Sequence, residues 1–92
     1  MDLEKLRQEI DEIDTQMCDL FARRMQVVSG IGKYKKENNI AIIQTARWDK
    51  VFSKVLEKGR DYGLTEKFLA DVFAAIHEAS VEVQNEIISK KD

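Results

Sequence analysis

The chain has 92 residues, of which 43% are hydrophobic and 35% are charged, and it contains no proline. This is enough for one small domain, which we expect over residues 1–92, and the composition excludes a disordered chain. The net charge of −2 at pH 7 argues against a surface that binds nucleic acid, and no apolar run reaches the roughly 20 residues that a membrane span needs.

The first predicted helix covers about residues 2–36, where apolar residues recur at three- and four-residue steps and Asp2 is a suitable N-cap. A helix of about 35 residues extends roughly 52 Å, whereas a compact domain of this size has a radius of gyration of only about 12 Å. Because the apolar stripe continues along the whole helix, its overhanging part needs a cover. The simplest cover is a second copy of the chain, so the pattern predicts a two-fold homodimer with exchanged long helices.

Two shorter helices follow. A loop at 37–39 precedes four apolar residues at 40–43, which could be mistaken for a strand but have no second strand to pair with. The second helix is predicted at about 44–58, and a turn at 59–63 separates it from a third helix at about 66–89, with Thr65 as its N-cap. The predicted fold class is therefore all-α: a three-helix protomer with a very long first helix.

Polar side chains interrupt the apolar faces of all three helices. Arg24 and Lys35 are eleven residues apart on the first helix and point the same way, while Arg47 lies on the second helix and Ser80 and Gln84 on the third. Each has an ordinary structural explanation, because long cations reach the surface and serine or glutamine can bond a neighbouring helix. Together, however, they place an excess of cations and hydrogen-bond donors on inward faces. An anionic ligand in the helical core would supply the missing charge.

Other motifs point to little further chemistry. Cys18 is the only cysteine, which excludes an internal disulfide and fits a reducing compartment. His77 is the only histidine and has no partner at metal-ligand spacing, and Trp48 suits a packing anchor. No phosphate-binding loop or catalytic triad is present, and the first residues lack a signal-peptide pattern. We therefore expect a cytoplasmic protein without a metal or a cofactor.

Several stretches together resemble the all-helical, AroQ-class chorismate mutases: residues 6–14, residues 20–25 and residues 32–35. Arg47, Ser80 and Gln84 then stand where that family's pattern has them, without any insertion. The resemblance covers essentially the whole chain. It implies an enzyme of aromatic amino-acid biosynthesis that rearranges chorismate to prephenate, a unimolecular reaction that needs no acid, base or nucleophile.

The resemblance also implies an intertwined homodimer with two shared active sites. Arg7 would enter the site of the partner subunit and, with Arg24, bind the substrate carboxylates. Lys35 and Gln84 would donate hydrogen bonds to the ether oxygen, and the polar lining would be completed by Arg47 and Ser80. The helix geometry agrees, because Arg7 lies about 100° around the helix and some 25 Å along it from Arg24, too far to reach the same small substrate.

Two positions depart from the family pattern. Family members often carry acids on either side of the second-helix arginine, which contact the ring hydroxyl, but this chain has Gln44 and Trp48 there. Gln44 can still bond the hydroxyl, whereas an indole only donates, so Trp48 would fill or close the pocket. These departures keep an isochorismate pyruvate lyase as an alternative. A third hypothesis is a non-catalytic helical module for dimerisation or regulation, such as a fragment of a larger polypeptide.

Overall fold

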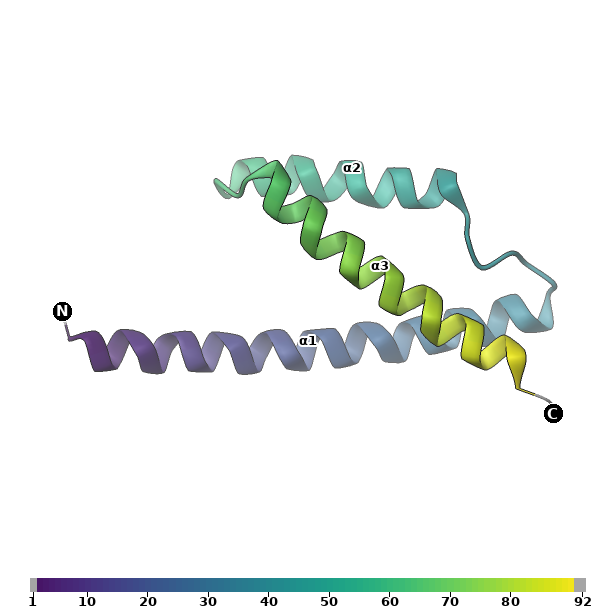
Figure 1. The fold of residues 1–92 in the computed structure, drawn as a ribbon, viewed down its shortest axis with the longest axis horizontal. Coiled ribbons are helices and arrows are strands. Elements are labelled where there is room, and N and C mark those ends of the chain that lie inside the picture. Colours follow the sequence, from purple (N-terminus) through teal and green to yellow (C-terminus); the bar gives the residue numbers. More distant parts are fainter. Residues whose placement is uncertain (1, 91–92) are drawn as a thin grey trace.

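A computed structural model describes residues 2–90, so the first residue and the last two residues of the predicted domain lie outside the described part. Within it the chain forms three helices and no strand: α1 (Leu3–Glu37), α2 (Thr45–Asp61) and α3 (Glu66–Ser89) (Figure 1). The all-α prediction is confirmed. None of the described helices is long and apolar enough to cross a membrane.

Both ends of α1 are capped by local hydrogen bonds. The Asp2 carboxylate accepts from the backbone N–H of Glu4 at 3.0 Å. At the other end, Asn39 has a φ of 53° and the N–H of Ile40 donates to the carbonyl of Lys35 at 2.9 Å. This ending, with a left-handed residue after the helix, resembles a Schellman motif. It reverses the chain direction, so that the loop before α2 returns toward the last turns of α1.

The helix α3 packs on both α1 and α2 and crosses diagonally between them (Figure 1). The buried hydrophobic core is small and consists of Val28, Leu69 and Ile76. The sequence predicts Gly59 in a turn, but it lies inside α2, which ends at Asp61. It is buried because Leu69 packs directly against it, and a Cβ at this position would collide with that side chain. The chain turns later, at Gly63, whose φ is +73°.

The N-terminal part of α1 extends beyond the other two helices (Figure 1). Every residue from 2 to 23 is exposed, including Leu3 at 61%, Ile10 at 56% and Leu20 at 57%. The protein measures 56 Å in its longest dimension, and its radius of gyration of 16.6 Å exceeds the roughly 12 Å of a compact domain. The predicted overhang is therefore present, whereas its cover by a second copy stays a prediction.

Gly32 lies where α1 and α3 approach each other. A Cβ at this position would lie 3.2 Å from Cδ1 of Ile87, 3.3 Å from Cγ of Gln84 and 3.4 Å from Cα of Gln84. The last of these is a backbone atom, which moves only if α3 moves. Gly32 therefore sets the spacing between the two helices, at the level of Gln84.

The two glycines of α1 should respond differently to alanine. At Gly30 nothing lies within 4 Å of the position that an added Cβ would take, so Gly30→Ala should raise the free energy of unfolding by up to about 1 kcal/mol through helix propensity. At Gly32 the crowding of α3 should cancel this gain. We expect Gly32→Ala to be less stable than Gly30→Ala by up to about 1 kcal/mol in urea unfolding at one protein concentration. Equal gains would contradict the close approach.

Candidate functional site

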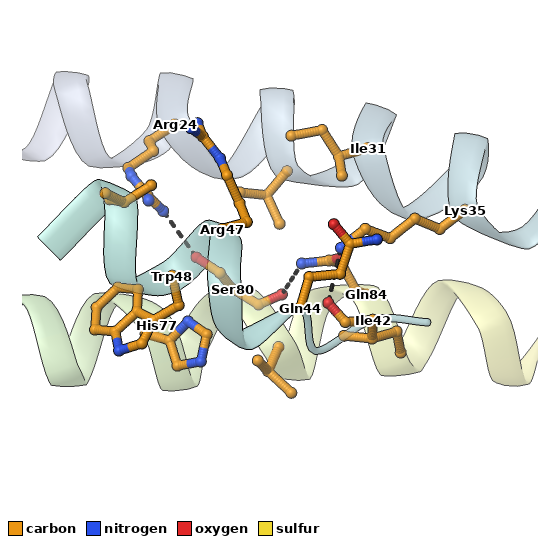
Figure 2. A pocket seen from close by; sticks show the side chains of 13 residues that line it. Arg24, Ile31, Lys35, Ile42, Gln44, Arg47, Trp48, His77, Ser80 and Gln84 are labelled. Carbon is orange, nitrogen blue, oxygen red and sulfur yellow. Dashed lines mark hydrogen bonds between the residues drawn. The ribbon is translucent and has the colours of Figure 1, made fainter. Parts of the chain in front are cut away.

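A pocket of about 310 Å³ opens between the three helices, with walls from each helix and from the loop before α2 (Figure 2). This volume is in the range of small-molecule binding sites. The lining consists of Arg24, Val28, Ile31, Lys35, Ile42, Gln44, Arg47, Trp48, Val51, His77, Ser80, Val81 and Gln84.

Arg24 on α1 is held by α3. Its Nη1 donates to Oγ of Ser80 at 2.8 Å, and this hydroxyl in turn donates to the carbonyl of Ile76 at 2.8 Å. Ser80 is only 6% exposed. Because its single O–H donates within α3, its oxygen is left to accept the hydrogen bond from Arg24. The guanidinium keeps further N–H groups for a ligand, in the planar arrangement that suits a carboxylate.

Lys35 lies at the other end of the α1 face and is bound by two neutral oxygens. Its Nζ donates to the carbonyl of Ile42 at 2.7 Å and to Oε1 of Gln84 at 2.8 Å. Gln84 is 7% exposed, and its Nε2 donates to the carbonyl of Ser80 at 3.2 Å. Burial lowers the pKa of Lys35, because removal from water disfavours the charged form. An ammonium group has three N–H donors, so one remains for a ligand.

The lining is positively charged. Arg24, Lys35 and the exposed Arg47 contribute three cations, and none of the described lining residues is acidic. The acceptors that hold Arg24 and Lys35 are a hydroxyl, an amide and a carbonyl, which position the cations without neutralising them. The arrangement therefore suits an anion with more than one carboxylate.

Aromatic rings form another part of the lining. Trp48 stacks on His77, with ring centroids 4.2 Å apart and planes inclined by 26°, which brings α2 and α3 together beside the cations. In Figure 2 these rings lie toward the end of the pocket away from Lys35.

The structure collects most of the residues that the sequence singles out. Seven of them line this one pocket: Arg24, Lys35, Gln44, Arg47, Trp48, Ser80 and Gln84. Arg7 does not, because it lies near the start of α1 beside the exposed Leu6 and Ile10. Within one chain it is therefore remote from the pocket, and the roles assigned to all eight residues stay predictions.

The sequence does not predict two parts of the site. His77 is not expected among the lining residues, although it precedes Ser80 by three positions and so shares its helix face. That spacing is the available signal. The carbonyl of Ile42 gives no signal in the sequence, because its position depends on the path of the loop after α1.

Comparison with known proteins agrees with this chemistry. The family described as "Chorismate mutase type II" matches residues 6–85. A "Bifunctional chorismate mutase/prephenate dehydratase" of Buchnera aphidicola is 34% identical over 84 residues, which is 91% of this chain and 22% of the relative. A "4-amino-4-deoxychorismate mutase" of Streptomyces venezuelae is 27% identical over 90 residues, 98% of this chain and 87% of the relative. No solved structure gives a significant match.

The chain corresponds to only part of several relatives. It spans 22% of the Buchnera aphidicola relative and also 22% of the Haemophilus influenzae "T-protein", to which it is 27% identical. The similarity therefore concerns one portion of those proteins.

The lowered pKa of Lys35 gives a direct test of the site. In an NMR titration of ¹³Cε-labelled lysines, with Lys35→Arg to assign the signal, Lys35 should titrate below the ordinary value of 10.5. As the pH rises through this lowered pKa the cation is lost, and with it any function that needs a positive donor here. An added dicarboxylate such as malonate should raise the pKa again, because a nearby anion favours the charged form. Titration at or above the ordinary value would contradict the burial of this amine.

Proposed function

The chain belongs to the type II chorismate mutase family, and from this premise we propose that its pocket rearranges chorismate to prephenate in aromatic amino-acid biosynthesis. The observation that carries the proposal is the charge of the pocket, which combines Arg24, Lys35 and Arg47 with no acid among its described lining residues. Chorismate has two carboxylates, so its binding would neutralise cations that the protein itself leaves unpaired.

The proposed reaction needs hydrogen-bond donors and cations in this site, and it needs no general base. One ether C–O bond breaks and one C–C bond forms within a single molecule, so no proton or leaving group is transferred. A protein accelerates such a step by holding the compact reactive conformer and by stabilising negative charge that develops on the ether oxygen. Preorganised cations and amides are sufficient for both tasks.

Lys35 and Gln84 are our candidates for the groups that contact the ether oxygen. Two of the three N–H bonds of Lys35 are directed to Ile42 and Gln84, which leaves one donor in a restrained direction. Gln84 uses one amide N–H on the carbonyl of Ser80 and has a second to offer. Because both side chains are already oriented, little reorganisation is needed when charge develops.

Arg24 is our candidate for a carboxylate ligand, with Arg47 and Ser80 beside it. Its hydrogen bond to the buried Ser80 restrains the guanidinium, which favours bidentate binding of a planar carboxylate. Gln44 offers an uncharged amide that can bond the ring hydroxyl.

We further propose that the active unit is a homodimer with exchanged α1 helices, and that Arg7 completes the site of the partner subunit. The exposed apolar residues of α1 support this, since Leu6, Ile10 and Ile13 are 39%, 56% and 49% exposed and form one stripe. A stripe of this length needs a cover, and Arg7 lies beside it. A cytoplasmic location, expected from the sequence, stays a prediction.

Relatives named 4-amino-4-deoxychorismate mutase make that compound a second candidate substrate for this pocket. It differs from chorismate at ring carbon 4, where an amino group replaces the hydroxyl. Isochorismate, with release of pyruvate, is the third possibility because Gln44 and Trp48 replace the acids common in the family.

The primary test is turnover of chorismate by the purified chain, followed by loss of its absorbance and identification of the product. We expect prephenate, and a rate constant at least about 10²-fold lower in Lys35→Ala, as for loss of a preorganised donor. Lys67→Ala is the matched control, since this lysine is exposed, pairs with Asp71 at 2.7 Å and is not in the pocket lining. Pyruvate from isochorismate would instead indicate the lyase. If neither compound is converted, the remaining hypothesis is a non-catalytic module for binding or assembly.

The shared site can be tested by mixing two inactive variants. Arg7→Ala and Arg24→Ala should each be inactive alone. If Arg7 acts in the partner's site, a heterodimer of the two has one intact site and one doubly altered site. After unfolding and refolding an equimolar mixture, about a quarter of wild-type activity should return, because half of the dimers are then mixed. No recovery from a mixture that is shown to exchange subunits would contradict the exchange of α1.

A further inference from the structure

One wall of the pocket is built from aromatic rings on two helices. Trp48 of α2 stacks on His77 of α3 at 4.2 Å between centroids, and it also stacks on Phe52, one turn further along α2, at 5.7 Å. Trp48 and His77 are both partly buried and both line the pocket (Figure 2). Contacts from two helices therefore hold this wall in place.

The wall offers no negative charge. An indole is uncharged, and an imidazole is either neutral or, when protonated, positive. The two lining residues nearest before Trp48 along the chain are Arg47, a cation, and Gln44, a neutral amide. A group bound here can exchange hydrogen bonds with neutral partners, but none of the described lining residues carries a carboxylate that could neutralise a positive charge on it.

We propose that Trp48 and His77 are specificity-determining residues, which make this site select a dicarboxylate whose ring carries an uncharged hydroxyl over one whose ring carries an ammonium group. This inference rests on the proposed function. The pocket cations would bind the two carboxylates of either compound, so discrimination arises at the ring substituent. A hydroxyl finds neutral partners, whereas an ammonium would lose water without an anionic partner and would be repelled by Arg47.

An ammonium group is disfavoured in every orientation of the ring. None of the described lining residues is acidic, so an ammonium group meets no counter-charge from them at any position in the pocket. In addition, Arg24 and Lys35 lie on the α1 side and repel a third positive charge. The wall of Trp48 and His77 lies away from Lys35 and carries no permanent charge, so it is where a neutral ring substituent is best accommodated.

A cation can also be attracted to an aromatic face, and this is the one interaction here that would favour an ammonium. In this structure His77 and Phe52 both stack on the indole of Trp48. The part of the indole that stacks on His77 at 4.2 Å is therefore not open to an ammonium group, which weakens this contribution relative to charge repulsion.

The test compares kcat/KM of the full chain for chorismate and for 4-amino-4-deoxychorismate. We expect the wild-type chain to prefer chorismate by at least about 10²-fold, because the site leaves the ammonium unpaired. Trp48→Glu introduces a carboxylate, and Trp48→Gln is its neutral match. The ratio of amino to hydroxyl substrate should rise at least about 10-fold in Trp48→Glu relative to Trp48→Gln.

A second pair, His77→Glu with His77→Gln, repeats the comparison from α3, and circular dichroism identifies any variant that fails to fold. The same shift is expected in this pair. Equal kcat/KM values for both compounds in the wild type would overturn the inference while leaving the proposed function intact. A preference for the amino compound would overturn the inference and favour the second candidate substrate. An unchanged ratio in the folded glutamate variants would overturn the role of these two residues. Failure to convert either compound would contradict the proposed function itself.

Discussion

Unneutralised cations around one pocket organise the surrounding structure. Lys35 illustrates the constraint: burial disfavours its charge and lowers its pKa, and the oxygens of Ile42 and Gln84 compensate in part. Arg24 receives the same kind of support from the hydroxyl of Ser80. Because these acceptors are neutral, they restrain the cations but leave their charge for a ligand. A pocket of this kind favours a dicarboxylate before any contact with a particular compound is considered.

The helix α3 connects this chemistry to the stability of the fold. It supplies Ser80 and Gln84, which are one turn apart and belong to the small buried interior. Gly32 allows the backbone of α1 to approach Gln84 closely, at the level where Lys35 reaches it. The packing of α1 on α3 therefore also positions the hydrogen-bond donors of Lys35 and Gln84. A change in the spacing of the two helices would affect both the packing and the position of these donors.

Two different parts of the site recognise two different features of the ligand. The cations favour an anionic ligand, since charge acts over several ångströms. In the specificity that we infer, the neutral wall of Trp48 and His77 acts at contact distance on the ring substituent. The exposed stripe of α1 adds a further requirement, because a single chain leaves it uncovered and keeps Arg7 away from the pocket. In the homodimer that we propose, assembly would bring Arg7 to the partner's pocket and so complete the site.

The sequence by itself determined the helical class, the overhang of the first helix and the residues that share each inward face, because the helical period relates positions along one chain. Seven residues chosen from the sequence line one pocket. Only the tertiary structure decided that Ile42 returns to Lys35, that His77 stacks on Trp48 and that Gly59 stays inside α2. These features depend on how helices rotate and approach one another. The distance between helices is set by side chains from all three helices together, such as Leu69 against Gly59. The hydrophobic period of a single helix does not predict it.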